Sequence, residues 1–273
     1  MKEYALELAS RQSGFNAKMN MLREYLQAYA LRIMQSEGVF RTTAFVGGTA
    51  LRFLYGLPRF SEDLDFSVEQ KQWANGAFAG LMKKMKDEFM LAGYDVSITY
   101  NDKKAVCSSF IRFKGLMYEA GMSALKDQKL SIKIEMDNNP PKGAVLRTDI
   151  VNKYFPLSFL SYDIASLFAG KVHALVTREY TKGRDFFDLG WYLSYQKGLR
   201  PNIKLLQNAL KQTGWKKDMP TEGSWIAFVL DVVHKADWSK VRKDVENFLE
   251  RPGDLEVFSK ENVIMLLEQN KKI

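Results

Sequence analysis

A glycine pair set between a strand pattern and a helical pattern constrains this sequence more than any other feature. Residues 43–46 form a short β-branched and aromatic run, which predicts a strand that ends at Gly47 and Gly48. Residues 49–55 then predict a helix, which Gly56 and Pro58 end. The order strand, glycine turn and helix predicts that this part of the chain is built from both strands and helices.

The rest of the chain divides into two parts of different character. Apolar spacing predicts helices at 3–35 and 70–91 and strands at 64–68, 95–100, 106–113 and 130–137. Strand signals fade after residues 138–143, and helical patterns continue from residue 162 to the end, with breaks near 181–183, 198–201, 219–223 and 251–253. We therefore expect an α+β fold with a soft boundary at 141–158, divided into domains 1–150 and 151–273.

Composition excludes several classes of protein. The 273 residues include one cysteine, Cys107, and two histidines, His173 and His234, which are too few for a structural zinc site or a disulfide. We expect all three to be packing or surface residues. No run of about 18 apolar residues occurs, so we expect a cytoplasmic protein with no membrane partner. Forty Lys and Arg against 32 Asp and Glu give a net charge of +8, which favours polyanionic partners.

Two aspartates follow the glycine pair on the next predicted strand. Asp63 and Asp65 are two positions apart, so both project from one face while Leu64 and Phe66 project from the other. A divalent cation would relieve the repulsion between two such carboxylates. The glycine turn lets backbone N–H groups approach an anion, and the helix after it adds its positive N-terminal end. Together these features predict a triphosphate site.

The combined motif G-G-T-A-L…R-x-S-x-D-L-D, residues 47–65, resembles the signature of the DNA polymerase β-like nucleotidyltransferase superfamily. More narrowly, it is similar to that of the AbiEii/AbiGii-type toxin branch. The resemblance implies a mixed sheet flanked by helices, followed by an all-helical C-terminal domain. It also implies two Mg²⁺ ions, bound by Asp63, Asp65 and a third carboxylate on a neighbouring strand. The substrate-binding residues that it implies are Gly47, Gly48, Thr49, Arg59 and Ser61.

The run at 130–137 offers two candidates for the third carboxylate. Alternation places Lys133, Glu135 and Asp137 on one face of the predicted strand. Glu135 is the choice because it lies inside the alternating run, whereas Asp137 lies at its end. The alternative, Asp137, stays open.

A lysine in the second half lies where an apolar side chain is expected. Lys171 falls within or beside the apolar stripe of a helix predicted at 162–178, so it needs an anionic partner. K-x-x-A-L, residues 171–175, and R-D-F-F-D-L, residues 184–189, resemble the later motifs of the toxin branch. The resemblance implies an essential lysine, Lys171, and an essential acid, Asp185 with Asp188 second. If Lys171 binds the triphosphate, Lys171→Met should keep stability and lose NTP binding.

A plain alternative exists for the two aspartates. Acidic residues are favoured in the first turn of a helix, and Arg184 is spaced to pair with Asp188 at i, i+4.

The resemblance implies the function of the whole chain. It implies transfer of a nucleoside monophosphate from an NTP to an acceptor, RNA and particularly tRNA. The protein would be the toxin of a bacterial toxin–antitoxin pair with a role in phage defence, neutralised by a separate antitoxin. Two alternatives remain: nucleotidylation of a protein or small-molecule hydroxyl, as in antibiotic modification, and a catalytically silent module that binds nucleic acid or protein.

Overall fold

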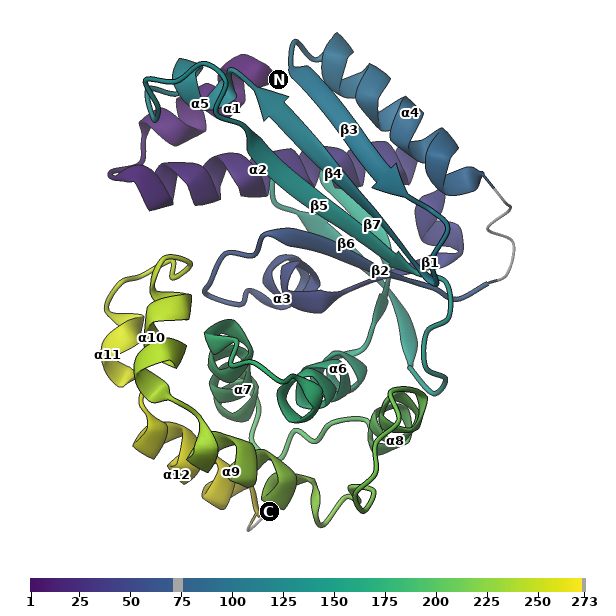
Figure 1. Ribbon diagram of the computed structural model, residues 1–273, viewed down its shortest axis with the longest axis vertical. Helices are drawn as coiled ribbons and strands as arrows, with labels where there is room; N and C mark the ends of the chain where they lie inside the picture. Colours follow the sequence, from purple (N-terminus) through teal and green to yellow (C-terminus); the bar gives the residue numbers. More distant parts are fainter. Residues whose placement is uncertain (71–75, 272–273) are drawn as a thin grey trace. The chain divides into compact units, whose positions relative to one another are not determined.

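The computed structural model describes residues 1–70 and 76–271 of the chain. Within these residues, seven strands form one mixed sheet in the order β3-β4-β5-β2-β1-β7-β6 (Figure 1). The strands are β1 (Thr43–Val46), β2 (Asp63–Val68), β3 (Asp95–Asn101), β4 (Val106–Lys114), β5 (Leu130–Asp137), β6 (Leu146–Asn152) and β7 (Pro156–Tyr162). The predictions of β1 to β5 are confirmed, each within two residues at either end.

Strand β2 lies inside the sheet, between β1 and β5. It runs antiparallel to β1, with Asp65 opposite Val46, and parallel to β5, with Asp65 opposite Glu135. A strand with a neighbour on both sides has its backbone groups paired in two ladders, so β2 provides a fixed support for the side chains it carries.

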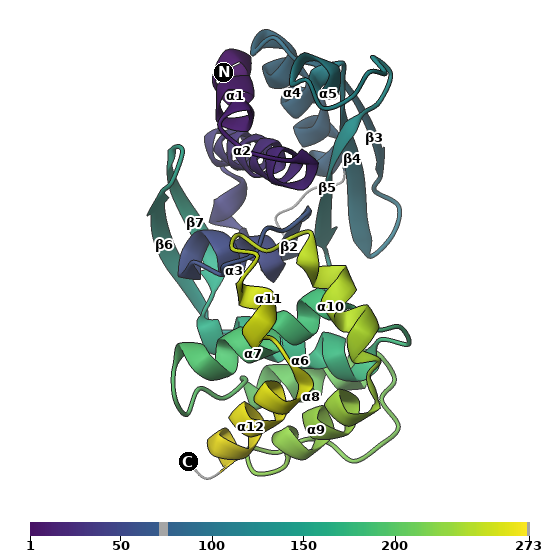
Figure 2. The same ribbon diagram turned by 90° about the vertical axis from the view of Figure 1, so that its left-hand side faces the viewer.

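The helices that accompany the sheet pack on it through apolar side chains. They are α1 (Lys2–Ser10), α2 (Phe15–Ser36), the short 3-10 helix η1 (Val39–Arg41), α3 (Gly47–Tyr55), α4 (Ala77–Leu91) and α5 (Leu116–Glu119). Helix α2 contacts β5 and α4 contacts β3, on the same side of β3–β5 (Figure 2). Buried side chains such as Leu26, Phe89 and Ile134 form the core there.

Two predicted helices differ in their bounds. The helix predicted at 3–35 is two helices, because Gly14 adopts a φ of 83° at the start of α2. The helix predicted at 70–91 is described only from Ala77, and residues 71–75 lie outside the described residues.

The C-terminal part is built from helices, as predicted. They are α6 (Ile164–Thr177), α7 (Gly183–Tyr195), α8 (Ile203–Gln212), α9 (Trp225–Lys235), α10 (Trp238–Glu246), α11 (Asp254–Val257) and α12 (Lys260–Lys271). Helix α6 packs against α7, α8 and α9, and α7 also packs against α10 and α12 (Figure 2). The predicted breaks all fall between these helices.

The division between the two parts differs from the predicted domains 1–150 and 151–273. The sheet unit contains Met1–Gly56, Phe60–Pro140 and Arg147–Ser161, and the helical unit contains Leu57–Arg59, Pro141–Leu146 and Tyr162–Ile273. Strands β6 and β7 were missed: β6 lies at the edge of the sheet and is largely exposed, so its sequence lacks a clear apolar alternation. Among the described residues, no helix is both long enough and apolar enough to cross a membrane.

Candidate active site

Two carboxylates project from one face of β2, as the sequence predicts. Asp63 and Asp65 are partly exposed, whereas Leu64 and Phe66 between and after them are buried in the core. The parallel register with β5 brings Lys133 beside Asp63 and Glu135 beside Asp65. The outward face of the sheet unit therefore carries three carboxylates and one lysine on two adjacent strands.

The turn between β1 and α3 approaches Asp65 very closely. Gly47 has a φ of 79°, and a Cβ atom built on it would lie 2.2 Å from Asp65 Oδ2. Helix α3 begins at Gly47, and Val46 at its N-cap is apolar, so the Val46 side chain cannot accept the first helical N–H groups. The structure therefore places a helix N-terminus directly beside a carboxylate, with no room for any side chain between them.

Because Gly47 lies so close to Asp65, we expect that adding one methyl group at Gly47 strongly affects stability and activity. Gly47→Ala should displace the Asp65 carboxylate, lower the melting temperature and remove nucleotidyl transfer, because the new Cβ overlaps Asp65 and the left-handed backbone disfavours alanine. Thermal melting and a transfer assay measure the two effects.

Gly56→Ala is the matched control. Gly56 has a similar φ of 71°, but a Cβ there meets nothing within 4 Å. Gly56→Ala should lower stability by the cost of backbone strain alone, about 1–3 kcal/mol, and should retain nucleotidyl transfer activity. Equal activity of the two variants would contradict the role of the Gly47–Asp65 contact.

Two further predicted substrate ligands lie close to this turn. The buried Thr49 hydroxyl donates a hydrogen bond to the backbone carbonyl of Asp63, so this side chain fastens α3 to the start of β2. Gln27 Nε2 donates to the backbone carbonyl of Ser61 at 3.1 Å, which fixes the segment before β2. Substrate binding by Gly48 and Ser61 stays a prediction, whereas the Thr49 hydroxyl is committed to Asp63.

The donor chemistry of this face suits Mg²⁺, a hard cation that proteins bind through one or two carboxylates together with substrate phosphates. Asp63 and Asp65 supply two carboxylates, and glycine at position 47 lets the backbone of the turn lie directly against Asp65. Within residues 1–70 and 76–271, no three His, Cys, Asp or Glu side chains are grouped so as to hold a metal ion. Glu135 instead forms an ion pair of 2.7 Å with Lys133. Asp63 and Asp65 fit the cation, and Glu135 or Asp137 as a third ligand stays a prediction.

A pocket of about 280 Å³ opens beside Asp63 in the sheet unit. It is lined by Met19, Arg23, Glu62, Asp63, Phe110, Lys129, Leu130, Ser131 and Lys133. Three of these residues are cationic, and two are acidic. The start of β2, where Asp63 lies, is thus adjacent to a pocket that can bind a negatively charged ligand.

The helical unit contains a second group of predicted residues. Lys171 Nζ lies 2.8 Å from Asp185 Oδ1 and 2.8 Å from Asp188 Oδ2. Arg178 Nη1 lies 3.1 Å from the other oxygen of Asp185. The prediction that Lys171 needs an anionic partner is confirmed, and both aspartates provide it. The alternative, that Arg184 pairs with Asp188, stays a prediction; the structure gives Arg184 Nε a contact of 3.9 Å with Asp244 Oδ2.

Arg59 belongs to this same group. Its Nε and Nη2 atoms donate to the two carboxylate oxygens of Asp188 at 2.6 and 2.5 Å, and its side chain is only 2% exposed. The predicted contact of Arg59 with the triphosphate therefore lacks the exposed guanidinium that it requires. Sequence reasoning missed the pair because the partners are 129 positions apart and share no local spacing.

The charges of the cluster shift the pKa of Asp185. Burial alone would raise the pKa of this carboxyl, but Lys171 and Arg178 outweigh burial and lower it to about 2. The same interactions raise the pKa of Lys171 against the opposing effect of burial. The lysine and the aspartate are therefore both charged at neutral pH.

This shift predicts a loss of stability in acid. The folded pKa of Asp185 lies below its ordinary value of 3.8, so the stabilisation is present above about pH 4 and is lost as the pH falls toward 2. The loss should be about 2 kcal/mol, since a pKa difference of one corresponds to about 1.4 kcal/mol. Urea unfolding between pH 5 and pH 2 should show a shallower decline for Asp185→Asn than for the wild type. Parallel declines would contradict the assignment.

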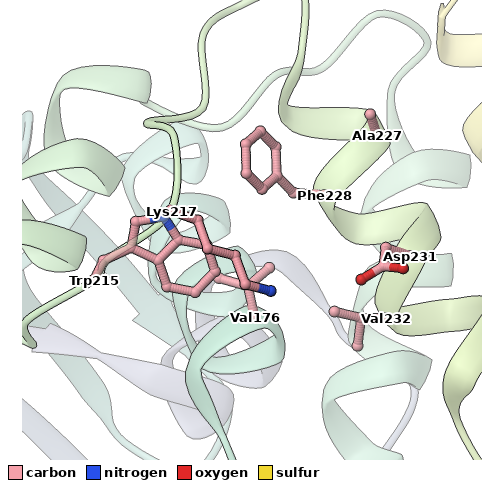
Figure 3. Close-up of a pocket in the computed structure, with 7 residues that line it drawn as sticks. All are labelled: Val176, Trp215, Lys217, Ala227, Phe228, Asp231 and Val232. Atoms are coloured by element: carbon pink, nitrogen blue, oxygen red, sulfur yellow. The ribbon is translucent and has the colours of Figure 1, made fainter.

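The helical unit also has a pocket that none of the predicted site residues line. It has a volume of about 290 Å³ and is lined by Val176, Trp215, Lys217, Ala227, Phe228, Asp231 and Val232 (Figure 3). Lys217 Nζ lies 5.4 Å from the centre of the Trp215 ring, and the Asp231 carboxylate pairs with Lys235 at 2.8 Å. The pocket is mainly apolar, with one cation and one anion at its border.

Comparison with known proteins identifies the family. The family model described as nucleotidyl transferase AbiEii toxin, type IV toxin–antitoxin system, matches residues 30–259, which is most of the chain. The chain belongs to the AbiEii family. The AbiEii assignment makes it a nucleotidyltransferase of a type IV toxin–antitoxin system, with an NTP as substrate and an antitoxin as partner. The resemblance inferred from the sequence motifs is confirmed.

One solved structure supports the fold of the chain. The crystal structure of JHP933 from Helicobacter pylori aligns with a TM-score of 0.51 at 19% identity, over 93% of this chain and 90% of that one. A second H. pylori structure, of a candidate nucleotidyltransferase, aligns with a TM-score of 0.49 at 19% identity, over 90% and 93%. The JHP933 likeness supports the α+β fold alone. No curated protein matches the chain.

Proposed function

We propose that this AbiEii-family enzyme transfers a nucleoside monophosphate from an NTP to an RNA acceptor, tRNA in particular, in a Mg²⁺-dependent reaction that arrests growth. The observation that carries the proposal is the pair Asp63 and Asp65 on the outward face of β2, with the Gly47 turn and the N-terminus of α3 against Asp65. Carboxylates beside a helix N-terminus suit a cation and a polyphosphate together.

The reaction needs a hydroxyl of the acceptor to attack the α-phosphorus of the NTP. A new P–O bond forms, the bond from the α-phosphorus to the bridging oxygen breaks, and pyrophosphate leaves with the electron pair of that bond. The proton of the attacking hydroxyl is released to solvent water. Backbone N–H groups at Gly47 and Gly48 hold triphosphate oxygens, and Asp63 and Asp65 fix the position of the cations. When bound, two Mg²⁺ ions supply charge neutralisation at the attacking and leaving oxygens. Positioning and charge neutralisation then provide most of the rate enhancement.

The cluster of the helical unit has a place in the same proposal. The Lys171 ammonium has three N–H groups, and it contacts two carboxylates, those of Asp185 and Asp188. Its side chain is 13% exposed. In this proposal the two aspartates position the ammonium, and the binding of a phosphate oxygen by Lys171 stays a prediction. Lys171, Arg178 and Arg59 together place three positive charges against the two negative charges of the aspartate pair.

RNA is the preferred acceptor because of the charge of the chain. A net charge of +8 favours a polyanion over a neutral small molecule or a typical protein hydroxyl. In cells, the same activity would stop growth, and the antitoxin would prevent the arrest. A role in phage defence would follow if infection releases the enzyme from the antitoxin.

Labelled nucleotides test the proposal directly. The protein is incubated with each α-labelled NTP, Mg²⁺ and total cellular RNA, and the labelled products are separated by size. We expect label in the tRNA fraction with one preferred NTP, and none when Mg²⁺ is removed by EDTA. Label in protein or in a small molecule would support the alternative substrates, and absence of label from every fraction would support a silent binding module.

A further inference from the structure

One row of side chains crosses the outward face of the sheet unit and ends at an exposed aromatic ring. The register places Asp63 of β2 beside Lys133 of β5, Lys133 beside Phe110 of β4, and Phe110 beside Thr99 of β3. Neighbouring strands are about 4.8 Å apart, so Phe110 lies about 10 Å along the row from Asp63.

Phe110 is exposed on the outward face of β4. Its ring is 39% exposed, whereas Ile111 and Phe113 of the same strand are fully buried in the core. The Arg112 guanidinium lies 5.3 Å and Lys133 Nζ 5.9 Å from the centre of the ring. Phe110 and Lys133 also line the pocket that opens beside Asp63, together with Lys129.

An aromatic ring between cations matches the chemistry of a nucleotide. A nucleobase stacks on an aromatic face, and adjacent basic side chains hold the phosphates on either side. The acidic residues of the face lie toward β2, which carries Asp63 and Asp65, and Glu135 lies beside Asp65 on β5. The face thus changes from acidic at β2 to basic and aromatic at β4.

The topology separates this ring from the triphosphate position. The Gly47 turn follows β1, which lies on one side of β2, whereas β5 and β4 lie on the other side. An NTP bound at the turn therefore occupies the β1 side of the carboxylates. A nucleotide that binds on the other side of β2, over β5 and β4, is therefore assigned as the acceptor.

We propose that Phe110 is the base-stacking residue of the acceptor subsite, with Arg112, Lys129 and Lys133 beside the phosphates of a single-stranded RNA end. The inference rests on the proposed function in one respect, the choice of RNA as acceptor. It adds the surface of the sheet unit that holds the acceptor and the side from which the acceptor approaches β2.

Binding measurements test this subsite without depending on transfer. The probes are a fluorescein-labelled single-stranded RNA of about 12 nucleotides, read by anisotropy, and a fluorescent NTP analogue, both with Ca²⁺ in place of Mg²⁺. Phe110→Ala should weaken RNA binding by at least about fivefold, since one base–aromatic stack contributes about that factor or more, and should leave NTP affinity unchanged. Phe110→Tyr should restore RNA affinity because it keeps a stacking ring. Equal melting temperatures of the variants confirm that each is folded.

Tyr118→Ala is the matched control. Tyr118 is a 45% exposed aromatic residue of the same unit with Lys126 Nζ 5.1 Å from its ring centre, but it lies on α5 outside the row. It should leave RNA affinity unchanged.

Two outcomes would overturn the inference. One is unchanged RNA affinity in Phe110→Ala, and the other is an equal loss of RNA and NTP affinity, which would assign the ring to the NTP base. Failure of the proposed function would give a different result. The wild-type protein would bind RNA, Phe110→Ala would weaken that binding, and no label would be transferred to RNA.

Discussion

Asp65→Asn should abolish nucleotidyl transfer while the protein stays folded. The substitution keeps the shape of the side chain and removes one of the two carboxylates that fit the cation, so the labelled-NTP assay should show a loss of at least about a thousandfold. Without Mg²⁺ the melting temperature should stay the same or rise slightly, because Asp63 and Asp65 no longer repel each other. Expression of wild type should stop growth of a bacterial host, and expression of Asp65→Asn at the same level should not.

Asp95→Asn provides the comparison for this result. Asp95 is an exposed aspartate at the start of β3, outside the row of Asp63 and Lys133. It should retain transfer and toxicity. Transfer by Asp65→Asn at a rate similar to that of Asp95→Asn would refute the metal assignment.

Lys171→Met should destabilise the helical unit strongly. The sequence alone suggests that a lysine at the edge of an apolar stripe can be replaced by methionine without loss of stability. In the structure, the Lys171 ammonium is the partner of two aspartates that are 2% and 0% exposed. Removing one member of a buried ionic network costs about 3–5 kcal/mol, and this loss should be visible in urea or thermal unfolding.

Lys182→Met is the control for this result, because it also removes one positive charge from the helical unit. Lys182 is half-buried at the N-cap of α7, where burial and the nearby Arg184 lower its pKa. Its charge is therefore poorly stabilised, and Lys182→Met should leave stability unchanged or raise it slightly. Adding Asp185→Asn to Lys171→Met should recover part of the lost stability, because one uncompensated carboxylate is removed. Equal stability of Lys171→Met and wild type would show that the cluster is not a cooperative network.

Features that depend on local spacing were predictable from the sequence. Alternation along 130–137 and around Asp63 fixed which side chains face outward, because successive residues of a strand project to opposite faces. The Gly47 turn was predictable because few residues other than glycine adopt its backbone conformation.

Features that depend on distant partners were not predictable. The family resemblance implies that Arg59 binds the substrate, and nothing near it in the chain indicates Asp188. Thr49 reads as a phosphate ligand at a helix start, yet its hydroxyl is committed to the backbone of Asp63. Strand β6 was missed for a related reason, since pairing within the sheet, rather than an apolar pattern of its own, holds it in place. Strand β7 does carry an apolar alternation, with Leu157 and Phe159 buried, that could have indicated it.

Segments of the two units alternate along the chain, and this limits where the chain can be cut into separate domains. Leu57–Arg59 and Pro141–Leu146 belong to the helical unit although sheet-unit residues precede and follow them. A fragment that starts at Tyr162 would contain buried Asp188 but not Arg59, the guanidinium that binds both of its oxygens. Neither unit is therefore a contiguous cassette that recombination can exchange intact, and the catalytic strand and the helical bundle are inherited as one piece.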